Sequence, residues 1–260
     1  MATKLLILLS PAKKLTTDPI SKGTSTQPIF KKEISLLSDV LKGYSMGDIS
    51  KLMKLSTKLS KLNYDRYQAF DPSHFSSKNA TQALLTFNGQ VYESLNATEL
   101  NDNAFEYLKK HLVILSGLYG FLRASDWMQP YRLEMGTALK VAGCANLYQF
   151  WKETLTKKID SLIKKESFTH IINCASAEYA SAVDFKSLDT PIINCQFKDF
   201  KNGQYKTIGI YAKKARGLMV RYLAEKKVNS LNKLKAFNLD GYEYSEEAST
   251  EHNFVFLRKV

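Results

Sequence analysis

The sequence is poor in cysteine and histidine, and the few it has are scattered. The three cysteines and four histidines are Cys144, Cys174, Cys195, His74, His111, His170 and His252. No two cysteines have Cys-x-x-Cys spacing, which excludes a disulfide framework and the common zinc motifs. We therefore predict no metal and no cofactor. Free thiols are typical of the cytoplasm. Cys174 and Cys195 lie in apolar runs, so we expect buried, inert thiols and not a peroxide-sensing pair.

Long hydrophobic runs are also missing. The first one, Leu5–Leu9, is followed by Pro11-Ala-Lys-Lys14 without a small-residue cleavage site, so it indicates a core strand and not a signal peptide. No stretch approaches the ~20 apolar residues that span a bilayer. We predict a cytoplasmic protein without a membrane partner.

Acidic residues are in deficit. The chain has 37 Lys and Arg against 25 Asp and Glu, a formal net charge of +12. Such a balance favours an anionic partner, which could be nucleic acid, an acidic membrane surface or a phosphorylated ligand.

The apolar segments predict an α/β fold. Runs rich in Ile, Val and Leu indicate strands at Leu5–Leu9, Leu112–Leu115, His170–Cys174, Pro191–Phe197, Thr207–Tyr211 and Phe254–Leu257. Helical patterns cover Lys31–Leu41, Asp48–Leu62, Asp102–Lys110, Leu147–Lys165 and Lys213–Asn229. Asn202-Gly203 predicts a hairpin, and hence an antiparallel pair in a mixed sheet flanked by helices. Asp240-Gly241 suggests a second one.

No linker rich in Pro, Gly or Ser divides the chain. We predict a single domain over residues 1–260, with residues 30–70 as a possible helical lobe.

The segment 48–66 places a lysine stripe beside a leucine stripe. Its lysines are Lys51, Lys54, Lys58 and Lys61, and no acidic residue occurs from Ile49 to Tyr64. The pattern is typical of a solvated helix face, and it also fits a surface that contacts phosphates. Ser56 and Thr57 are poor helix formers, so two short helices around a tight hairpin are an alternative.

A second basic stretch runs from Lys198 to Lys235. It holds eleven Lys or Arg against Asp199 and Glu225, and so carries +9 of the net charge. We predict that its central residues, together with those of the first stretch, form the DNA-binding surface; they are Lys213, Lys214, Arg216 and Arg221. The alternative for Arg216 is an ion pair with Glu134 or Glu178, because buried charges are usually paired.

A charged pocket is predicted where the strands end. Ligands of α/β sheets gather at the carboxyl ends of strands, and polar residues follow several of the predicted ones. A few charged residues lie in a largely apolar stretch, where they are expected to be buried and burial of a charge is costly. The stretch consists of Ser116-Gly-Leu-Tyr-Gly-Phe-Leu-Arg123 and Gln129-Pro-Tyr-Arg-Leu-Glu-Met-Gly136. The predicted pocket residues are Ser10, Lys13, Arg123, Tyr131, Arg132, Glu134, Ser176, Glu178, Tyr179, Lys213 and Arg216.

This residue set permits general acid–base chemistry, since it contains two carboxylates, cations and tyrosines. A serine nucleophile is less favoured, because neither Ser10 nor Ser176 has a histidine at a telling position. Phosphate-loop and dinucleotide fingerprints do not occur. Whether the chain is an enzyme stays open.

Several of these pieces together resemble the peroxide stress protein family YaaA. The matching segments are Ser10-Pro-Ala-Lys13, Ser116 to Gly136, Leu147-Tyr-Gln-Phe-Trp151, Ile172-Asn-Cys-Ala-Ser176 with Glu178-Tyr179, and Tyr211-Ala-Lys-Lys-Ala-Arg-Gly-Leu-Met219. They occur in the family's order and span nearly the whole chain. Cys174 stands where the family usually has Leu, and Ala124-Ser125 where a pair containing Pro is common. Neither departure removes a charge.

The resemblance implies a cytoplasmic protein of the hydrogen peroxide response that binds DNA and is linked to lowering free intracellular iron. It also implies a helix-hairpin-helix element in the 48–66 region. We expect duplex or distorted DNA, with low sequence selectivity, as the partner. The alternative is an enzyme that acts on a nucleotide-like or phosphorylated small molecule in the charged pocket. A basic structural or ribosome-associated protein is a third, weaker possibility.

Overall fold

The fold is built on an eight-stranded sheet in the order β11-β12-β9-β8-β1-β5-β6, with β10 paired to β9. This computed structural model describes residues 3–16 and 20–259. The strands are β1 (Leu5–Leu9), β5 (Leu112–Ser116), β6 (Gly120–Arg123), β8 (His170–Asn173), β9 (Ile192–Lys201), β10 (Gln204–Lys206), β11 (Glu243–Tyr244) and β12 (Asn253–Arg258).

The five central strands, β5-β1-β8-β9-β12, are parallel, whereas β6, β10 and β11 pair antiparallel at the margins. The sheet is therefore mixed, as predicted. Numbered along the chain, the parallel strands have the order 2-1-3-4-5. In such doubly wound sheets, the connections leave in opposite directions from the first and third strands, which opens a crevice at their carboxyl ends. Here that point lies between β1 and β8.

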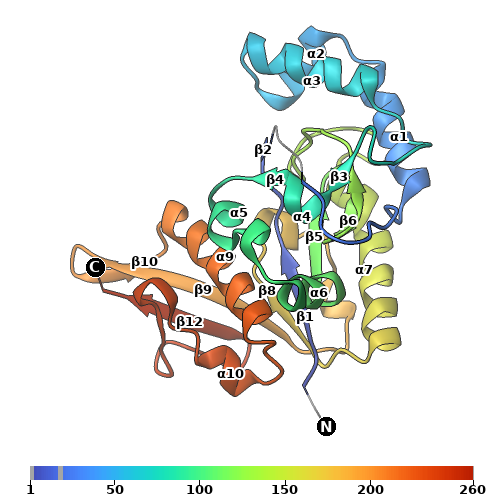
Figure 1. Cartoon of the computed structure of the whole chain (residues 1–260). Helices are drawn as coiled ribbons and strands as arrows, with labels where there is room; N and C mark the ends of the chain where they lie inside the picture. The colour runs from blue at the N-terminus through green and yellow to red at the C-terminus, as the bar shows by residue number, and fades with distance from the viewer. Residues whose placement is uncertain (1–2, 17–19, 260) are drawn as a thin grey trace.

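Helices bury the sheet on both faces. All five residues of β1 are buried, which requires cover above and below. Figure 1 shows α5 (Gln90–Leu95), α6 (Asp102–His111) and α9 (Gly209–Glu225) together in front of the sheet, with the long α7 (Leu147–Glu166) at its right. Trp151 of α7 is fully buried and donates its indole N–H to the Gly117 carbonyl at 2.8 Å.

Three helices form a lobe beyond the sheet: α1 (Lys31–Lys42), α2 (Met46–Met53) and α3 (Thr57–Ala69). They project at the top of Figure 1. A capping box of Ser45 and Asp48 starts α2, and Lys54 ends it in the left-handed conformation (φ 51°). The predicted segment Asp48–Leu62 is thus two helices with a three-residue connection, the alternative that Ser56 and Thr57 suggested. Its assignment as a helix-hairpin-helix DNA-binding element stays a prediction.

Short elements complete the chain. They are β2 (Lys14–Leu15), β3 (Thr81–Gln82), β4 (Phe87–Asn88), β7 (Trp127–Met128), α4 (Ala83–Thr86), α8 (Ala177–Ala180), α10 (Leu231–Lys235) and the 3-10 turns Ala97–Glu99, Phe185–Ser187 and Leu239–Gly241. None of the described helices is long and apolar enough to cross a membrane.

The predicted strand Thr207–Tyr211 is wrong. Strand β10 ends at Lys206 and α9 begins at Gly209, earlier than the predicted Lys213. Two of the apolar residues that indicated a strand, Ile210 and Tyr211, are exposed on the first turn of α9. Their apolar character therefore did not report burial.

One of the two predicted hairpins is present. Asn202 (φ 55°) and Gly203 (φ 78°) form the turn between β9 and β10, which are antiparallel. Asp240 and Gly241 also have positive φ, at 56° and 77°, but they close a 3-10 turn before β11 and join no two paired strands. A left-handed pair of residues thus marks a tight turn but does not determine whether the flanking segments pair as strands.

Candidate functional site: a charged cavity at the strand ends

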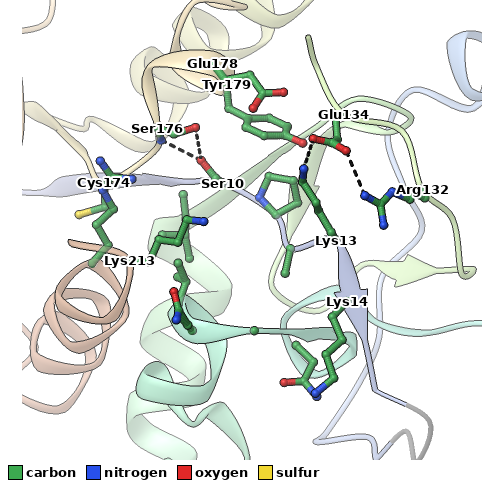
Figure 2. Close-up of a pocket in the computed structure, with 18 of the residues that line it drawn as sticks. Ser10, Lys13, Lys14, Arg132, Glu134, Cys174, Ser176, Glu178, Tyr179 and Lys213 are labelled. Carbon is green, nitrogen blue, oxygen red and sulfur yellow. Dashed lines mark hydrogen bonds and ion pairs between the residues drawn. The ribbon is translucent and has the colours of Figure 1, made fainter. Parts of the chain in front are cut away.

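A cavity of about 350 Å³ opens at the carboxyl ends of β1 and β8, where the strand order reverses. It lies between the residues after these two strands, the connection from β4 to α5, the segment 131–134 and α9. Figure 2 shows Lys13 and Arg132 directed toward Glu134, and Ser10 directed toward Ser176. Ten of the eleven predicted pocket residues line it: Ser10, Lys13, Tyr131, Arg132, Glu134, Ser176, Glu178, Tyr179, Lys213 and Arg216.

Ser10 and Ser176 fix the two strand ends to each other. The Ser176 amide donates to Ser10 Oγ at 2.8 Å, and Ser10 Oγ donates to Ser176 Oγ at 3.2 Å. Tyr92 of α5 donates its hydroxyl to the Ser10 carbonyl at 2.8 Å. Both serines are therefore held in structural hydrogen bonds, and no base activates either as a nucleophile in the described part of the chain.

Glu134 organises the cations on one wall. Lys13 Nζ lies 2.5 Å from one of its oxygens, and Arg132 Nη2 lies 3.3 Å from the other. The segment that carries Arg132 is anchored to the helical lobe, because Tyr67 of α3 donates its hydroxyl to the Arg132 carbonyl. Arg132 Nε is buried without a hydrogen-bond partner. Two cations thus share one carboxylate, and the wall keeps a net positive charge.

Glu178 and two tyrosines lie beside this wall. Glu178 Oε1 accepts a hydrogen bond from the Gly136 amide at 3.0 Å. Burial raises the pKa of the Tyr179 hydroxyl and that of Tyr131, which lies 2.6 Å from Ser116 Oγ. Both tyrosines are therefore neutral hydrogen-bonding groups at physiological pH.

Arg216 lies deep in the cavity and has no carboxylate partner in the described part of the chain. The predicted ion pair with Glu134 or Glu178 does not form, because these carboxylates face Lys13, Arg132 and the Gly136 amide instead. Arg216 Nε is buried without a hydrogen-bond partner, and burial lowers the pKa of the guanidinium. A buried cation in this state favours an anion close by.

Arg123 is the predicted pocket residue that lies elsewhere. Its guanidinium pairs with Asp126, with Nε 2.9 Å from Oδ1, and donates to the Gln27 carbonyl at 2.8 Å. The burial of Asp126 raises the pKa of its carboxyl group, and Arg123 counters that effect. Arg123 thus neutralises an acidic side chain three residues away, which explains why it does not reach the cavity.

Sequence reasoning missed part of the lining. Lys14, the segment 88–91 and Cys174 also line the cavity. Gly89 has a φ of 135°, a conformation that favours glycine, and a Cβ there would lie 3.6 Å from Ala12. The sequence offers one signal for this loop, which is the glycine directly before the residues that form α5.

The eight residues predicted to bind DNA fall into two groups. Lys51, Lys54, Lys58 and Lys61 are exposed on the lobe. The second group lies on α9, where Lys213 is exposed at the cavity and Lys214 pairs with Asp240 at 2.9 Å.

Arg216 and Arg221 face the protein interior. Arg221 pairs with Glu225 at 2.9 Å and donates to the carbonyls of Leu95 and Asn96. These contacts bind α9 to the end of α5. Both arginines are partly buried, because the helix face that carries them packs against the domain, and their part in DNA binding stays a prediction.

The arrangement can hold an anion and position protons, since cations surround two carboxylates and two protonated tyrosines. Within residues 3–16 and 20–259, no group of three or more His, Cys, Asp or Glu could hold a metal ion.

The family model of the peroxide stress protein YaaA matches residues 5–248. The chain belongs to this family. It is also similar over 98% of its length to curated bacterial proteins named UPF0246. The one from Polaromonas sp. is 46% identical over 256 residues and is covered to 99%. The one from Francisella philomiragia is 43% identical over 255 residues and is covered completely. The family's name supports a role in peroxide stress.

Proposed function

We propose that this YaaA-family chain acts in the cytoplasm during hydrogen peroxide stress by binding DNA. The partner is duplex or distorted DNA, bound with low sequence selectivity, and the activity is linked to lowering free intracellular iron. The link to iron rests on the family resemblance. DNA binding is also supported by the charge and by the lobe.

The lobe lysines carry the proposal. Lys51, Lys54 and Lys58, hereafter the lysine surface, are exposed, and none forms an ion pair within the described residues. Lys61, the fourth lysine of the predicted stripe, pairs with Asp65 at 2.9 Å. Unpaired surface lysines release counterions when they meet phosphates, which provides sequence-independent affinity.

The start of α3 strengthens this surface. Ser56 makes no side-chain cap to α3, and the first turn contains no acidic residue. Free amides and the positive end of the helix dipole therefore face the same solvent as the lysine surface. A phosphate near this turn would meet backbone donors as well as lysines.

Fluorescence anisotropy with duplex DNA tests the proposal. The variant Lys51→Gln/Lys54→Gln/Lys58→Gln should bind more weakly, and the slope of log K against log salt should fall by roughly 3, at about 0.9 per phosphate contact. The control Lys157→Gln/Lys164→Gln/Lys165→Gln removes the same charge from α7. Equal losses in both variants would mean that only net charge matters, and no loss in either would reject the proposal.

A second function is supported by the cavity, which has the chemistry to bind a phosphorylated or nucleotide-like small molecule. Lys13, Arg132, Lys213 and Arg216 line it, and both arginines have a buried Nε without a partner. If the chain is an enzyme, the carboxylates and tyrosines beside these cations supply its acid–base groups.

Thermal unfolding with added inorganic phosphate or a nucleoside monophosphate tests this second function. Ligand that binds the native state raises Tm by mass action, and Arg132→Met should abolish the rise. An equal rise in the variant would show binding elsewhere, and no rise in the wild type would remove these two ligands from consideration.

A further inference from the structure

Two cysteines distant in sequence are neighbours in the sheet. In the parallel pair of β8 and β9, Asn173 lies opposite Asn194. The next residues are Cys174 and Cys195, whose thiols are within hydrogen-bonding distance of each other. On its other side, the Cys174 amide extends the ladder with β1 by donating to the Leu8 carbonyl at 2.9 Å. Adjacent strands are about 4.8 Å apart, and disulfides join Cα atoms roughly 4.4–6.8 Å apart. The spacing of the two strands therefore lies within the range that a disulfide spans.

Arg216 lies against both thiols. It lines the charged cavity together with Cys174, and it lines a second, more open cavity of about 850 Å³ together with Cys195. The groups that interact electrostatically with its guanidinium are these two thiols. Since Arg216 has no carboxylate partner in the described part of the chain, a thiolate can supply the missing negative charge.

We propose that Cys174 and Cys195 are a peroxide-oxidisable dithiol and that Arg216 is its positioning residue. The Cys174 thiolate attacks one oxygen of hydrogen peroxide and breaks the O–O bond. Cys174 becomes a sulfenic acid, and the departing hydroxide takes up a proton to leave as water. The Cys195 sulfur then attacks the sulfenic sulfur and forms the disulfide, while its proton and the sulfenic hydroxyl leave as a second water. Two thiols are oxidised and one peroxide is reduced.

The environment of each thiol fits its step. Both thiols are buried, with Cys174 at the wall of the charged cavity and Cys195 at the wall of the second cavity, so small solutes can approach the pair from either side. The hydrogen bond with Cys174, followed by burial, raises the pKa of the Cys195 thiol. Cys195 therefore stays protonated until the sulfenic acid forms. This chemistry is independent of DNA binding, so a negative result for one proposal does not affect the other.

The test uses the reduced, full-length protein. It is treated with sub-millimolar hydrogen peroxide, alkylated and analysed by peptide mass spectrometry. The wild type should form a Cys174–Cys195 disulfide that dithiothreitol reverses, before Cys144 is oxidised. Cys195→Ser should instead accumulate a Cys174 sulfenic acid that dimedone traps. Arg216→Met should slow oxidation at least tenfold, and Arg216→Lys should restore part of the rate. Cys144→Ser is the matched control and should behave as the wild type.

The wild-type measurement is decisive by itself, so it does not depend on any variant folding. Cys174 and Cys195 that stay as free thiols while Cys144 is oxidised would overturn the proposal. A disulfide that forms at the same rate in folded Arg216→Met would remove Arg216 from it.

Discussion

At the scale of residues, the cavity has more cationic side chains than carboxylates that pair with them. Glu134 pairs with both Lys13 and Arg132, and Arg216 has no carboxylate partner in the described part of the chain. A fully buried pair that loses one partner typically costs about 3–5 kcal/mol, because the other charge is left alone. Glu134 is different, since its side chain is 25% exposed and keeps Lys13. The cation excess can therefore serve a ligand without endangering the fold.

Arg132→Met tests this distinction. The free energy of unfolding should fall by about 1 kcal/mol, because Glu134 retains a partner and some water. Urea denaturation measures the change, and Lys157→Met, which breaks an exposed pair with Glu153, is the control. A loss of about 3 kcal/mol or more would show that Arg132 is a structural ion partner and not a ligand contact.

His111 should make stability depend on pH. Its Nδ1 lies 2.7 Å from the Leu5 carbonyl oxygen, and its ring stacks on Tyr107 at 4.0 Å. Burial lowers the pKa of His111, so below the unfolded value of about 6.5 the unfolded state binds the proton first. Stability is then complete above that pH and is lost as the pH falls, by up to about 1.4 kcal/mol per pH unit.

Urea unfolding between about pH 7.5 and pH 5 measures this slope. His111→Gln should reduce it, leaving the contribution of His170, whose pKa burial also lowers. An unchanged slope would mean that His111 is protonated in the native state as well.

The positions of pocket residues could be predicted where they directly follow a strand in the sequence. Polar residues that follow β1 and β8 must meet at one edge of the sheet, so ten pocket residues were found. Arg123 was misplaced because a local carboxylate, Asp126, competes for it. The thiols were judged by their distance in sequence, whereas strand register makes Cys174 and Cys195 neighbours. Register is not visible in a single sequence.

At the scale of elements, α5 and α9 pack closely together and both line the cavity. Gly217 makes this contact possible, because a Cβ there would lie 2.0 Å from the Val91 carbonyl oxygen and 2.2 Å from Ser94 Oγ. The same interface carries Val91 and Arg216 into the cavity. Any side chain at residue 217 must therefore push the two helices apart.

Gly217→Ala should lower the free energy of unfolding by about 1–3 kcal/mol, the range expected for overpacking. Gly209→Ala is the matched control in the same helix, since a Cβ there meets nothing within 4 Å. It should be neutral or slightly stabilising. Chemical denaturation measures both, and equal effects would show that the close approach of α5 and α9 is not required.

The main elements were predictable and their boundaries were less so. Strongly apolar runs such as Leu5–Leu9 and Leu112–Leu115 could be assigned because burial on both faces leaves a continuous pattern. The start of α9 could not, because Ile210 and Tyr211 are apolar but exposed. Two-residue strands such as β2 and β7 pair through tertiary contacts and leave no pattern in the sequence.

At the scale of the whole molecule, charge is divided between two regions with different surroundings. The cavity cations lie at the edge of the sheet with carboxylates close by, whereas the lysine surface lies on the projecting lobe and faces solvent (Figure 1). The first arrangement suits a small anion and the second suits a polyanion. Removing one charge set should leave the other function intact.

Survival of hydrogen peroxide exposure by cells that lack the gene tests the central claim most directly. Complementation with the wild type should restore survival. Lys51→Gln/Lys54→Gln/Lys58→Gln, at equal abundance and Tm, should restore little, while the α7 control variant should restore it fully. Full protection by a lysine-surface variant that no longer binds DNA in vitro would contradict the claim that this protein protects cells by binding DNA.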